Sequence, residues 1–480
     1  MKKFSVLCLL LSLILILQCG MPALAVDAED TQPERVDVSV NGGSHTLRGT
    51  KPLGGNVDIL DTAKAALVYE MNTGTLLYAW NADAKAYPGS LAKLMTALLA
   101  VEMGNLEDVV TVSETAVSSL SWDAKTIRMK AGEIFTVKDL IYCVMVASSN
   151  EACNVLAEHI GGDKATFVEM MNARAEELGC TGTHFTNAHG LHDENQYTTA
   201  RDIALIVEKG MEYELYAESF TEDLYIIPEN PNGEERVLYT TNYMISKDVV
   251  QKFYNPRVIG GKSGAVSIDD RSLIVTAREN GLKLMAVVMG AEGEYEPDGV
   301  SMHWFGNFEE MEDLLDYAFA AFETAQILQS GKSVAQFSVF GGENDVVGCP
   351  VSSAKSSLPL GTTMNDLDWK YVLDSDLKAP VEEGTIIGTV QVWYGNVCVA
   401  QSEMVAMNGS RVKTAVGKPD PVTPDPIAGD DGAGTVLKVM GIVFAGLLLV
   451  ALVYFGLLWL RAARVKARHR RRRKDRRRNR

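Results

Sequence analysis

The stretch from Val258 to Met289 constrains the fold most, because it reads as three strand-like segments in succession. Asp269-Asp270 separates the first segment from the second, and Asn280-Gly281 separates the second from the third. Turn signals this short favour antiparallel neighbours, since parallel strands need a long crossover. Helical spacing follows at Phe308 to Phe322, which is expected to pack on the sheet. The chain is therefore predicted to contain an antiparallel meander covered by at least one helix.

The chain before this meander is predicted to be a hairpin followed by helices. Two strands are expected in Ala65 to Trp80, with their turn at Asn72-Thr73-Gly74. A helix is expected to follow Pro88-Gly89 and to stop at Gly104. A capping box is expected at Thr136 to Asp139, and a break between helices at Ser148-Ser149-Asn150. Further helices are expected at 152–160, 167–178 and 199–210. Helices and an antiparallel sheet together indicate an α/β (α+β) fold.

The N-terminal 25 residues have the layout of a secretory signal peptide. Lys2 and Lys3 precede an apolar run, Phe4 to Leu17, and Ala23-Leu24-Ala25 is a suitable cleavage site. Residues 26–55 are polar without a sustained period and are expected to form a flexible leader. The following part of the chain is therefore expected outside the cytoplasm.

The C-terminal part is expected to hold a small β domain and a membrane anchor. Residues 332–414 are strand-like, with a hairpin signal at Gly395-Asn396, and residues 415–435 are a Pro- and Gly-rich linker. Val439 to Leu460 carries no charge and is long enough to span a bilayer. The basic residues 461–480 then place this tail in the cytoplasm and predict a single-pass protein of the cell membrane. Anionic lipid headgroups are favoured over nucleic acid as the tail's contact.

Charge and cysteine content exclude some functions for the body. The net charge is −17 although residues 461–480 carry thirteen lysines or arginines against one aspartate, so the body is strongly acidic and is not expected to bind nucleic acid. Five cysteines remain after signal cleavage, with no C-x-x-C spacing: Cys143, Cys153, Cys180, Cys349 and Cys398. Buried free thiols are expected, with a disulfide as the alternative.

The first turn of the helix after Gly89 carries a candidate catalytic pair. Ser90 and Lys93 are three residues apart and share one helical face. A hydroxyl becomes a useful nucleophile beside a base, and a lysine whose environment lowers its pKa can be that base. This is the S-x-x-K arrangement of the serine β-lactamases and penicillin-binding proteins, which on its own also occurs by chance.

Two further motifs follow in order, Ser148-x-Asn150 and Lys262-Ser263-Gly264. With all three, the chain resembles the low-molecular-mass penicillin-binding proteins of the D-alanyl-D-alanine carboxypeptidase type, peptidase family S11. The text between the motifs also fits: Lys93-Leu94-Met95-Thr96-Ala97, Ala157-Glu158-His159-Ile160-Gly161-Gly162, Met171-Asn172, Glu177-Leu178-Gly179, Asn187-Ala188-His189-Gly190-Leu191-His192-Asp193 and Thr198-Thr199-Ala200-Arg201-Asp202. The resemblance implies a transpeptidase-like domain over residues 56–328, and the region near Ala379 to Met407 is similar to the β domain that follows it in this family.

The resemblance also implies roles for these residues. Ser90 is the expected nucleophile, Lys93 its base, and Ser148 and Asn150 the proton relay and the orienting amide. The backbone N–H groups of Ser90 and Ala265 are the expected oxyanion hole. Lys262, Ser263 and Gly264 are expected to receive the terminal carboxylate of a peptidoglycan stem peptide, and β-lactams are expected to acylate Ser90.

Two positions depart from the family pattern. The third motif usually reads Lys-Thr-Gly, and Ser263 keeps the hydroxyl. The family often has an arginine just before the helix that contains Leu314 to Tyr317, where this chain has Asn307. Arg271 is the candidate to replace that arginine as a carboxylate ligand.

Alternative functions stay open at this point. A β-lactamase of the same fold is disfavoured, because no Glu-x-x-x-Asn element lies between Ser148 and Lys262. A non-catalytic receptor for wall peptides or β-lactams remains possible because of Asn307, and cleavage of ordinary L-peptides is not excluded by the motifs. No metal or organic cofactor is implied; His184, His189 and His192 lie near Asp193, but the family resemblance already accounts for that loop.

Overall fold

The computed structural model describes residues 51–413, apart from 55–56, 123, 230–232 and 296–301. The predicted signal peptide, nearly all of the leader, the linker, the segment 439–460 and the basic tail lie outside the described residues. Within the described ranges, no helix combines the length and the apolar character that a membrane span requires.

A five-stranded antiparallel sheet forms the centre of the N-terminal part, with the strand order β2-β1-β9-β8-β7. Its strands are β1 (Ala65–Glu70), β2 (Thr75–Trp80), β7 (Val258–Ser267), β8 (Asp270–Glu279) and β9 (Leu282–Ala291). The predicted hairpin and the predicted meander are both confirmed. Because β1 pairs with β9, the two ends of this part of the chain meet in one sheet, and β7 is left as an edge strand.

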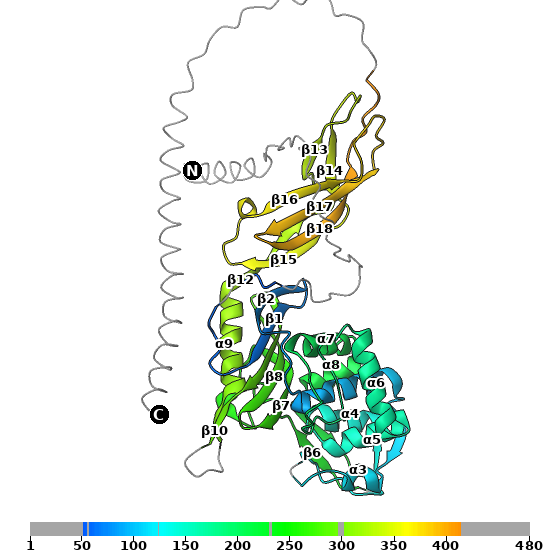
Figure 1. Ribbon diagram of the computed structural model, residues 1–480, viewed down its shortest axis with the longest axis vertical. Helices are drawn as coiled ribbons and strands as arrows, with labels where there is room; N and C mark the ends of the chain where they lie inside the picture. Colours follow the sequence, from blue (N-terminus) through cyan, green and yellow to red (C-terminus); the bar gives the residue numbers. More distant parts are fainter. Residues whose placement is uncertain (1–50, 55–56, 123, 230–232, 296–301, 414–480) are drawn as a thin grey trace, which may run out of the picture. The chain divides into compact units, whose positions relative to one another are not determined.

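Helices cover both faces of this sheet (Figure 1). One face packs against a helical layer through side chains such as Leu67 and Val287, and the other face packs against α9 (Gly306–Ala321) through side chains such as Val68 and Val288. The alternation of Leu67 and Val68 is the period-2 pattern of a strand buried on both sides. The expectation that the helix after the meander packs on the sheet is confirmed.

The helical layer follows the predicted breaks closely. It contains η1 (Gly89–Ala92), α2 (Lys93–Met103), α3 (Glu114–Ser118), α4 (Val137–Met145), α5 (Asn150–Gly161), α6 (Lys164–Glu177), α7 (Ala200–Gly210) and α8 (Glu214–Thr221). Thr136 and Asp139 form the predicted capping box at the start of α4. The first turn of the Ser90 helix is a 3₁₀ turn, so the α-helix itself begins at Lys93.

Short elements were not predicted from the sequence. They are α3, α8 and two small hairpins, β3 (Val109–Thr111) with β4 (Ile134–Thr136) and β5 (Leu224–Ile227) with β6 (Arg236–Tyr239). Each is eight residues or fewer, which is too short for a hydrophobic period to distinguish it from a loop.

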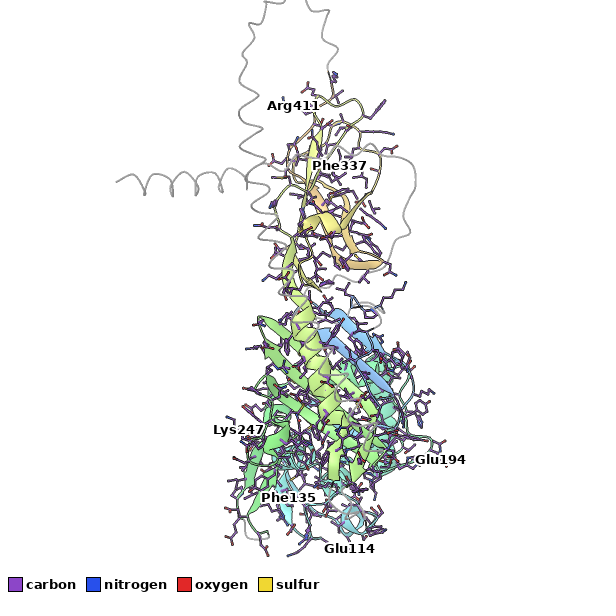
Figure 2. The ribbon with its side chains drawn as sticks, turned by 90° about the vertical axis from the view of Figure 1, so that its left-hand side faces the viewer. Glu114, Phe135, Glu194, Lys247, Phe337 and Arg411 are labelled. Atoms are coloured by element: carbon purple, nitrogen blue, oxygen red, sulfur yellow. The ribbon has the colours of Figure 1, made fainter. Side chains whose placement is uncertain are left out.

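Strands alone make up the C-terminal described part, apart from the one-turn helix η3 (Met364–Asp366). It comprises β12 (Phe322–Leu328), β13 (Ala335–Phe337), β14 (Val346–Pro350), β15 (Ala354–Pro359), β16 (Asp368–Leu373), β17 (Ile386–Tyr394) and β18 (Val397–Ala406), and the small strands β10 (Gly293–Tyr295) and β11 (Met302–Phe305) precede it. The hairpin at Gly395-Asn396 is confirmed as the β17–β18 turn. Phe337, labelled in Figure 2, packs edge to face on Tyr371, with 5.6 Å between ring centroids. Because β12 pairs with β15, we place the boundary of this β domain near Phe322.

The cysteines of the described residues are all free thiols. Cys143, Cys153, Cys180 and Cys349 are buried, and Cys398 is partly exposed. The expectation of buried free thiols therefore holds for four of the five residues.

Candidate active site

Ser90 and Lys93 lie in contact at the junction between η1 and α2. Pro88 and Gly89, which has a φ of +51°, turn the chain sharply into the helix. The Nζ atom of Lys93 is 3.0 Å from the Oγ atom of Ser90 and hydrogen-bonded to it. The predicted pair is thus close enough for a proton to pass directly between the hydroxyl and the amine.

Burial sets the protonation of Lys93. The side chain is fully buried, and this loss of hydration lowers the pKa of Lys93 to about 8, although Cys153 and Glu151 act in the opposite direction. The Lys93 ammonium also donates to the backbone carbonyl of His189. A lysine with this pKa supplies some free amine near neutral pH, as a general base must.

The loop 187–193 closes against the nucleophile turn. Gly190 has a φ of +84°, and a Cβ atom placed on it would lie 1.8 Å from the carbonyl oxygen of Gly89. Asn187 Oδ1 accepts hydrogen bonds from the N–H groups of His189 and Gly190 and so holds the turn. Burial, followed by the charge of Lys93, lowers the pKa of His189 to about 3, so this imidazole is neutral beside the site.

The second motif occupies the break between α4 and α5. Ser148 has a φ of +59°, which is uncommon for a residue with a side chain and marks a backbone held in place by its surroundings. Ser149 caps α5 by accepting from the N–H of Ala152. The Oδ1 atom of Asn150 is buried without a hydrogen-bond partner among the described residues. Such an unpaired acceptor is costly unless a ligand or a rotated side chain supplies a donor.

The third motif lies on the edge strand β7. The ammonium of Lys262 donates to Thr241 Oγ1 at 3.2 Å and to the carbonyl of Ser263 at 3.1 Å. The hydroxyl of Ser263 donates to the carbonyl of Thr241 at 2.9 Å. Thr241, which the sequence analysis did not single out, therefore holds both side chains; nothing in its local sequence marks it.

Glycines bring β7 against the nucleophile turn. A Cβ atom on Gly264 would lie 3.1 Å from the carbonyl oxygen of Pro88, and one on Gly89 would lie 3.0 Å from the backbone of Ala265. Both distances are tighter than side chains normally tolerate, so the approach depends on glycine. The backbone of Ala265 thus lies directly beside the turn that carries Ser90.

Arg271 lies opposite Ala265 in the β7–β8 ladder. Its Nε atom donates to Asn307 Oδ1 at 3.4 Å, and its guanidinium stacks on Phe305, 4.9 Å from the ring centroid. Asn307 is buried and also donates to the carbonyl of Ser272. Asn307, which stands where the family often has an arginine, is therefore in contact with Arg271, the candidate to replace that arginine.

Lys262 is the second buried lysine of this site. Burial and the nearby charges of Lys93 and Lys125 lower the pKa of Lys262.

Ser148 makes no hydrogen bond to Ser90 or Lys93 within the described residues, although α4 and α5 both pack on α2.

The described ranges contain no group of three or more histidine, cysteine, aspartate or glutamate side chains suited to a metal ion. His184 instead contacts the carbonyl of Asn195, and His192 packs on Tyr87.

Comparison with known proteins matches this chain to one family. The family model described as D-alanyl-D-alanine carboxypeptidase matches residues 57–293, and the model described as the C-terminal domain of penicillin-binding protein 5 matches residues 322–410. D-alanyl-D-alanine carboxypeptidase DacA of Haemophilus influenzae is 31% identical over 360 residues, which is 72% of this chain and 85% of the relative. The chain belongs to peptidase family S11, the D-alanyl-D-alanine carboxypeptidases.

Other S11 proteins show the same extent of similarity. DacF of Bacillus subtilis is 30% identical over 355 residues, covering 73% of this chain and 86% of that protein. The crystal structure of penicillin-binding protein 5 from Haemophilus influenzae superposes with a TM-score of 0.58 at 29% identity, over 74% of this chain and all of that one. The S11 transpeptidase-like fold and its C-terminal β domain are therefore established for this chain.

Proposed function

We propose that this S11 protein removes the terminal D-alanine from peptidoglycan pentapeptide stems through an acyl-enzyme on Ser90. The observation that carries the proposal is the 3.0 Å contact between Ser90 Oγ and the buried amine of Lys93. A pKa of about 8 for Lys93 supports its role as the base. Family membership supports the substrate class.

In the first half-reaction, Ser90 Oγ attacks the carbonyl carbon of the penultimate D-alanine while its proton passes to Lys93. The resulting oxyanion is held by the N–H groups of Ser90 and Ala265, each donor contributing about 3 kcal/mol. The peptide C–N bond then breaks, and Ser148 hands a proton to the leaving amine. Asn150 orients Lys93 and the substrate amide through its unpaired Oδ1 atom.

In the second half-reaction, water attacks the ester carbonyl and gives its proton to Lys93. The Ser90 hydroxyl is restored as the ester C–O bond breaks and the Ser90 oxygen takes the proton from Lys93. The shortened stem leaves as a carboxylic acid, which loses its proton to the released D-alanine amine through the solvent. Atoms and charge balance without a cofactor, because each proton taken up by Lys93 in one half-reaction is available for the leaving group in the same half-reaction.

The substrate's terminal carboxylate binds at the Ala265 end of β7. Lys262 supplies its ammonium to this carboxylate, and Arg271 supplies the guanidinium that Asn307 contacts. The hydroxyl of Ser263 donates to the carboxylate after it rotates away from the carbonyl of Thr241. Gly264 lets the substrate backbone approach the strand. Charge-assisted contacts of this kind are stronger than neutral hydrogen bonds.

β-Lactams inhibit the enzyme in this proposal by acylating Ser90. A β-lactamase function is disfavoured because the sequence between Ser148 and Lys262 offers no Glu-x-x-x-Asn element to activate water on the penicilloyl ester. We therefore expect the penicilloyl-enzyme to persist.

The enzyme acts outside the cytoplasm in this proposal. The support is the signal-like residues 1–25 and the uncharged segment 439–460 followed by a basic tail. Extraction of membranes with alkaline carbonate tests the anchor: the full chain should stay in the pellet, and a chain ending before Val439 should not.

The activity test follows D-alanine release from a pentapeptide ending in D-Ala-D-Ala, with the full chain in detergent. Wild type and Ser118→Ala, a serine change on the exposed α3, should release D-alanine, and Ser90→Ala should release none. A matched peptide ending in L-Ala-L-Ala tests the alternative of ordinary proteolysis. Penicillin labelling of Ser90 without any D-alanine release would instead favour the receptor function and Asn307 as its cause.

A further inference from the structure

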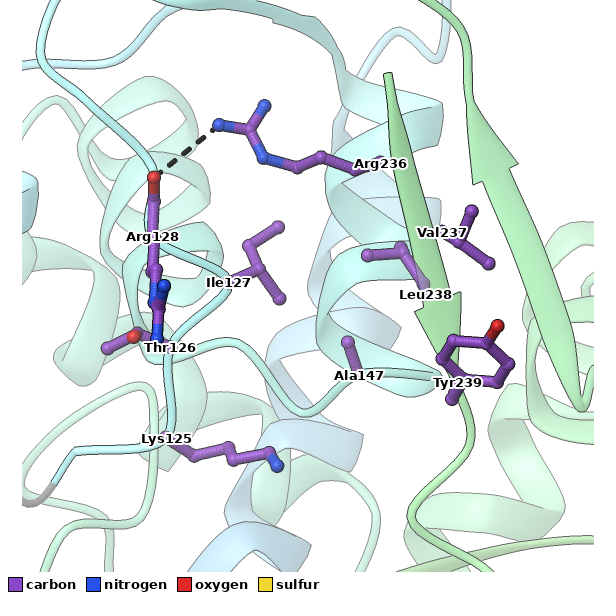
Figure 3. A pocket seen from close by; sticks show the side chains of 9 residues that line it. All are labelled: Lys125, Thr126, Ile127, Arg128, Ala147, Arg236, Val237, Leu238 and Tyr239. Atoms are coloured by element: carbon purple, nitrogen blue, oxygen red, sulfur yellow. Dashed lines mark hydrogen bonds between the residues drawn. The ribbon is translucent and has the colours of Figure 1, made fainter. Parts of the chain in front are cut away.

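A pocket of about 340 Å³ adjoins the active site and has no part in the mechanism above. Its walls are the loop segment 125–128, Ala147 and the strand β6 (Figure 3). Arg128 has a φ of +59°, so this loop carries a charged side chain at a backbone conformation that side chains seldom adopt.

The pocket lies next to the second and third motifs. Ala147 directly precedes Ser148, and the carbonyl of Lys125 accepts from the N–H of Asn150 at 2.9 Å. Strand β6 leads within two residues of Tyr239 to Thr241, the residue that holds Lys262 and Ser263. The charge of Lys125 also reaches Lys262 and lowers its pKa.

Three cationic side chains line this pocket, and among the described residues only Arg236 has a carboxylate partner. Arg236 donates to both carboxylate oxygens of Glu133 at 2.8 Å, with the two side chains 14% and 6% exposed. Arg236 also reaches the carbonyl of Arg128 at 3.4 Å, as Figure 3 shows. Lys125 and Arg128 are exposed, and within the described residues neither has a carboxylate at ion-pair distance.

The strand wall adds apolar surface. On β6, Leu238 points with Arg236 toward the loop 125–128, whereas Val237 and Tyr239 lie on the opposite side of the strand (Figure 3). Leu238, together with Ile127 and Ala147 across the pocket, supplies the apolar wall. The pocket therefore combines unneutralised cations with an apolar wall, which suits the methylenes and the carboxylate of an acidic side chain.

We propose that this pocket, here called the cationic pocket, selects leaving groups that carry a second carboxylate besides the terminal one. The chemical class is a D-amino acid with an acidic side chain, or a larger acidic amine, in place of the terminal D-alanine. The volume greatly exceeds what the methyl group of D-alanine occupies, and the free cations are Lys125 and Arg128. This inference rests on the proposed carboxypeptidase function.

The test compares three acylated peptides that end in D-Ala-D-Ala, D-Ala-D-Glu and D-Ala-D-Gln, with the full chain in detergent. D-Glu and D-Gln have the same shape, so the ratio of their kcat/KM values isolates the side-chain charge. We expect the wild type to favour D-Glu over D-Gln about 5-fold, as one partly exposed charge pair allows. The preference should fall as salt rises from about 0.05 M to 0.5 M.

Arg128→Gln should bring the ratio close to one, and Arg128→Lys should restore part of it. Arg278→Gln, on an exposed arginine of β8 away from the pocket, is the matched control and should keep the wild-type ratio. Lys125 is not used as the diagnostic site, because its charge also acts on Lys262.

The outcomes separate the two proposals. Release of D-alanine together with equal cleavage of the D-Glu and D-Gln peptides, or an unchanged ratio in Arg128→Gln, overturns the cationic pocket and leaves the carboxypeptidase in place. No release of D-alanine overturns the carboxypeptidase and this inference with it.

Discussion

The Nζ atom of Lys93 lies 3.0 Å from the Oγ atom of Ser90, and no water-accessible surface remains on the lysine side chain. Burial lowers the pKa of the amine, and the contact directs it to one hydroxyl. The proposed chemistry therefore rests on a feature that is unfavourable in an ordinary protein interior: among the described residues, Lys93 has no carboxylate in hydrogen-bond contact.

Activity should rise with pH through the pKa of Lys93. Burial lowers this pKa to about 8, so the catalytic free amine increases as pH passes that value. Between pH 7 and pH 9 the free amine rises from about one tenth to about nine tenths, which predicts an increase of about 10-fold in kcat/KM. A pH profile of penicillin acylation, which also needs the base, is the check; a flat profile from pH 6.5 to 9 would contradict Lys93 as the base.

Lys93→Met should abolish acylation without lowering stability. The methionine keeps much of the side-chain volume and removes a buried cation, a change that is often neutral or stabilising. We expect a Tm equal to or above that of the wild type, and acylation reduced by about 1000-fold or more. Thermal unfolding and penicillin labelling measure the two effects. A marked drop in Tm would show that the ammonium contacts to Ser90 and His189 matter more than its desolvation.

Ser263 should act through its hydroxyl rather than through its small size. Ser263→Ala removes a hydrogen bond to a charged group and should lower kcat/KM by about 10-fold. Ser263→Thr keeps the hydroxyl and restricts χ1, so activity should stay within about 3-fold of the wild type. Steady-state kinetics with a D-Ala-D-Ala peptide distinguishes these results, and equal activity of the alanine variant would exclude a role for the hydroxyl.

Arg271 should contribute to recognition of the terminal carboxylate. Arg271→Gln should lower kcat/KM by about 10-fold to 100-fold for a peptide with a free terminal carboxylate. The same peptide with an amidated terminus lacks the charge, so the variant and the wild type should cleave it alike. Asn307→Ala should have a smaller effect that does not add to that of Arg271→Gln, because the two side chains are in contact.

Gly190→Ala should damage the site specifically. The new methyl group would meet the carbonyl oxygen of Gly89 and displace the turn that carries Ser90. Gly179 is a matched control: its φ is +77°, and a Cβ atom there would meet nothing within 4 Å. Gly179→Ala should therefore cost only about 1 kcal/mol of backbone strain, whereas Gly190→Ala should also reduce penicillin acylation at least 10-fold.

The sequence was sufficient wherever one segment determines its own structure. The Thr136 to Asp139 capping box, the hairpin around Asn72 to Gly74 and the meander after Val258 depend on contacts within a few residues, and all three are present. The contact between Ser90 and Lys93 follows from one helical turn in the same way.

Features that depend on distant segments could not be predicted. Thr241 holds Lys262 and Ser263, but it becomes their neighbour only when the segment after β6 folds against β7. The cationic pocket likewise joins Arg128 and Arg236, which are far apart in the chain. Ser148 has a positive φ at the break between α4 and α5, and no local signal in the sequence predicts it.

The position of β7 at the edge of the sheet has a consequence for solubility. An open strand edge invites pairing with a second chain and aggregation. Irregular pairing with β8 flanks residues 260–265 on both sides, between Val258 and Gly260 and between Ala265 and Ser267, and the buried side chain of Lys262 lies within this stretch. Natural sheets use such features to discourage edge-to-edge association. The strand that is proposed to bind a wall peptide is therefore also protected against pairing with the same strand of a second chain.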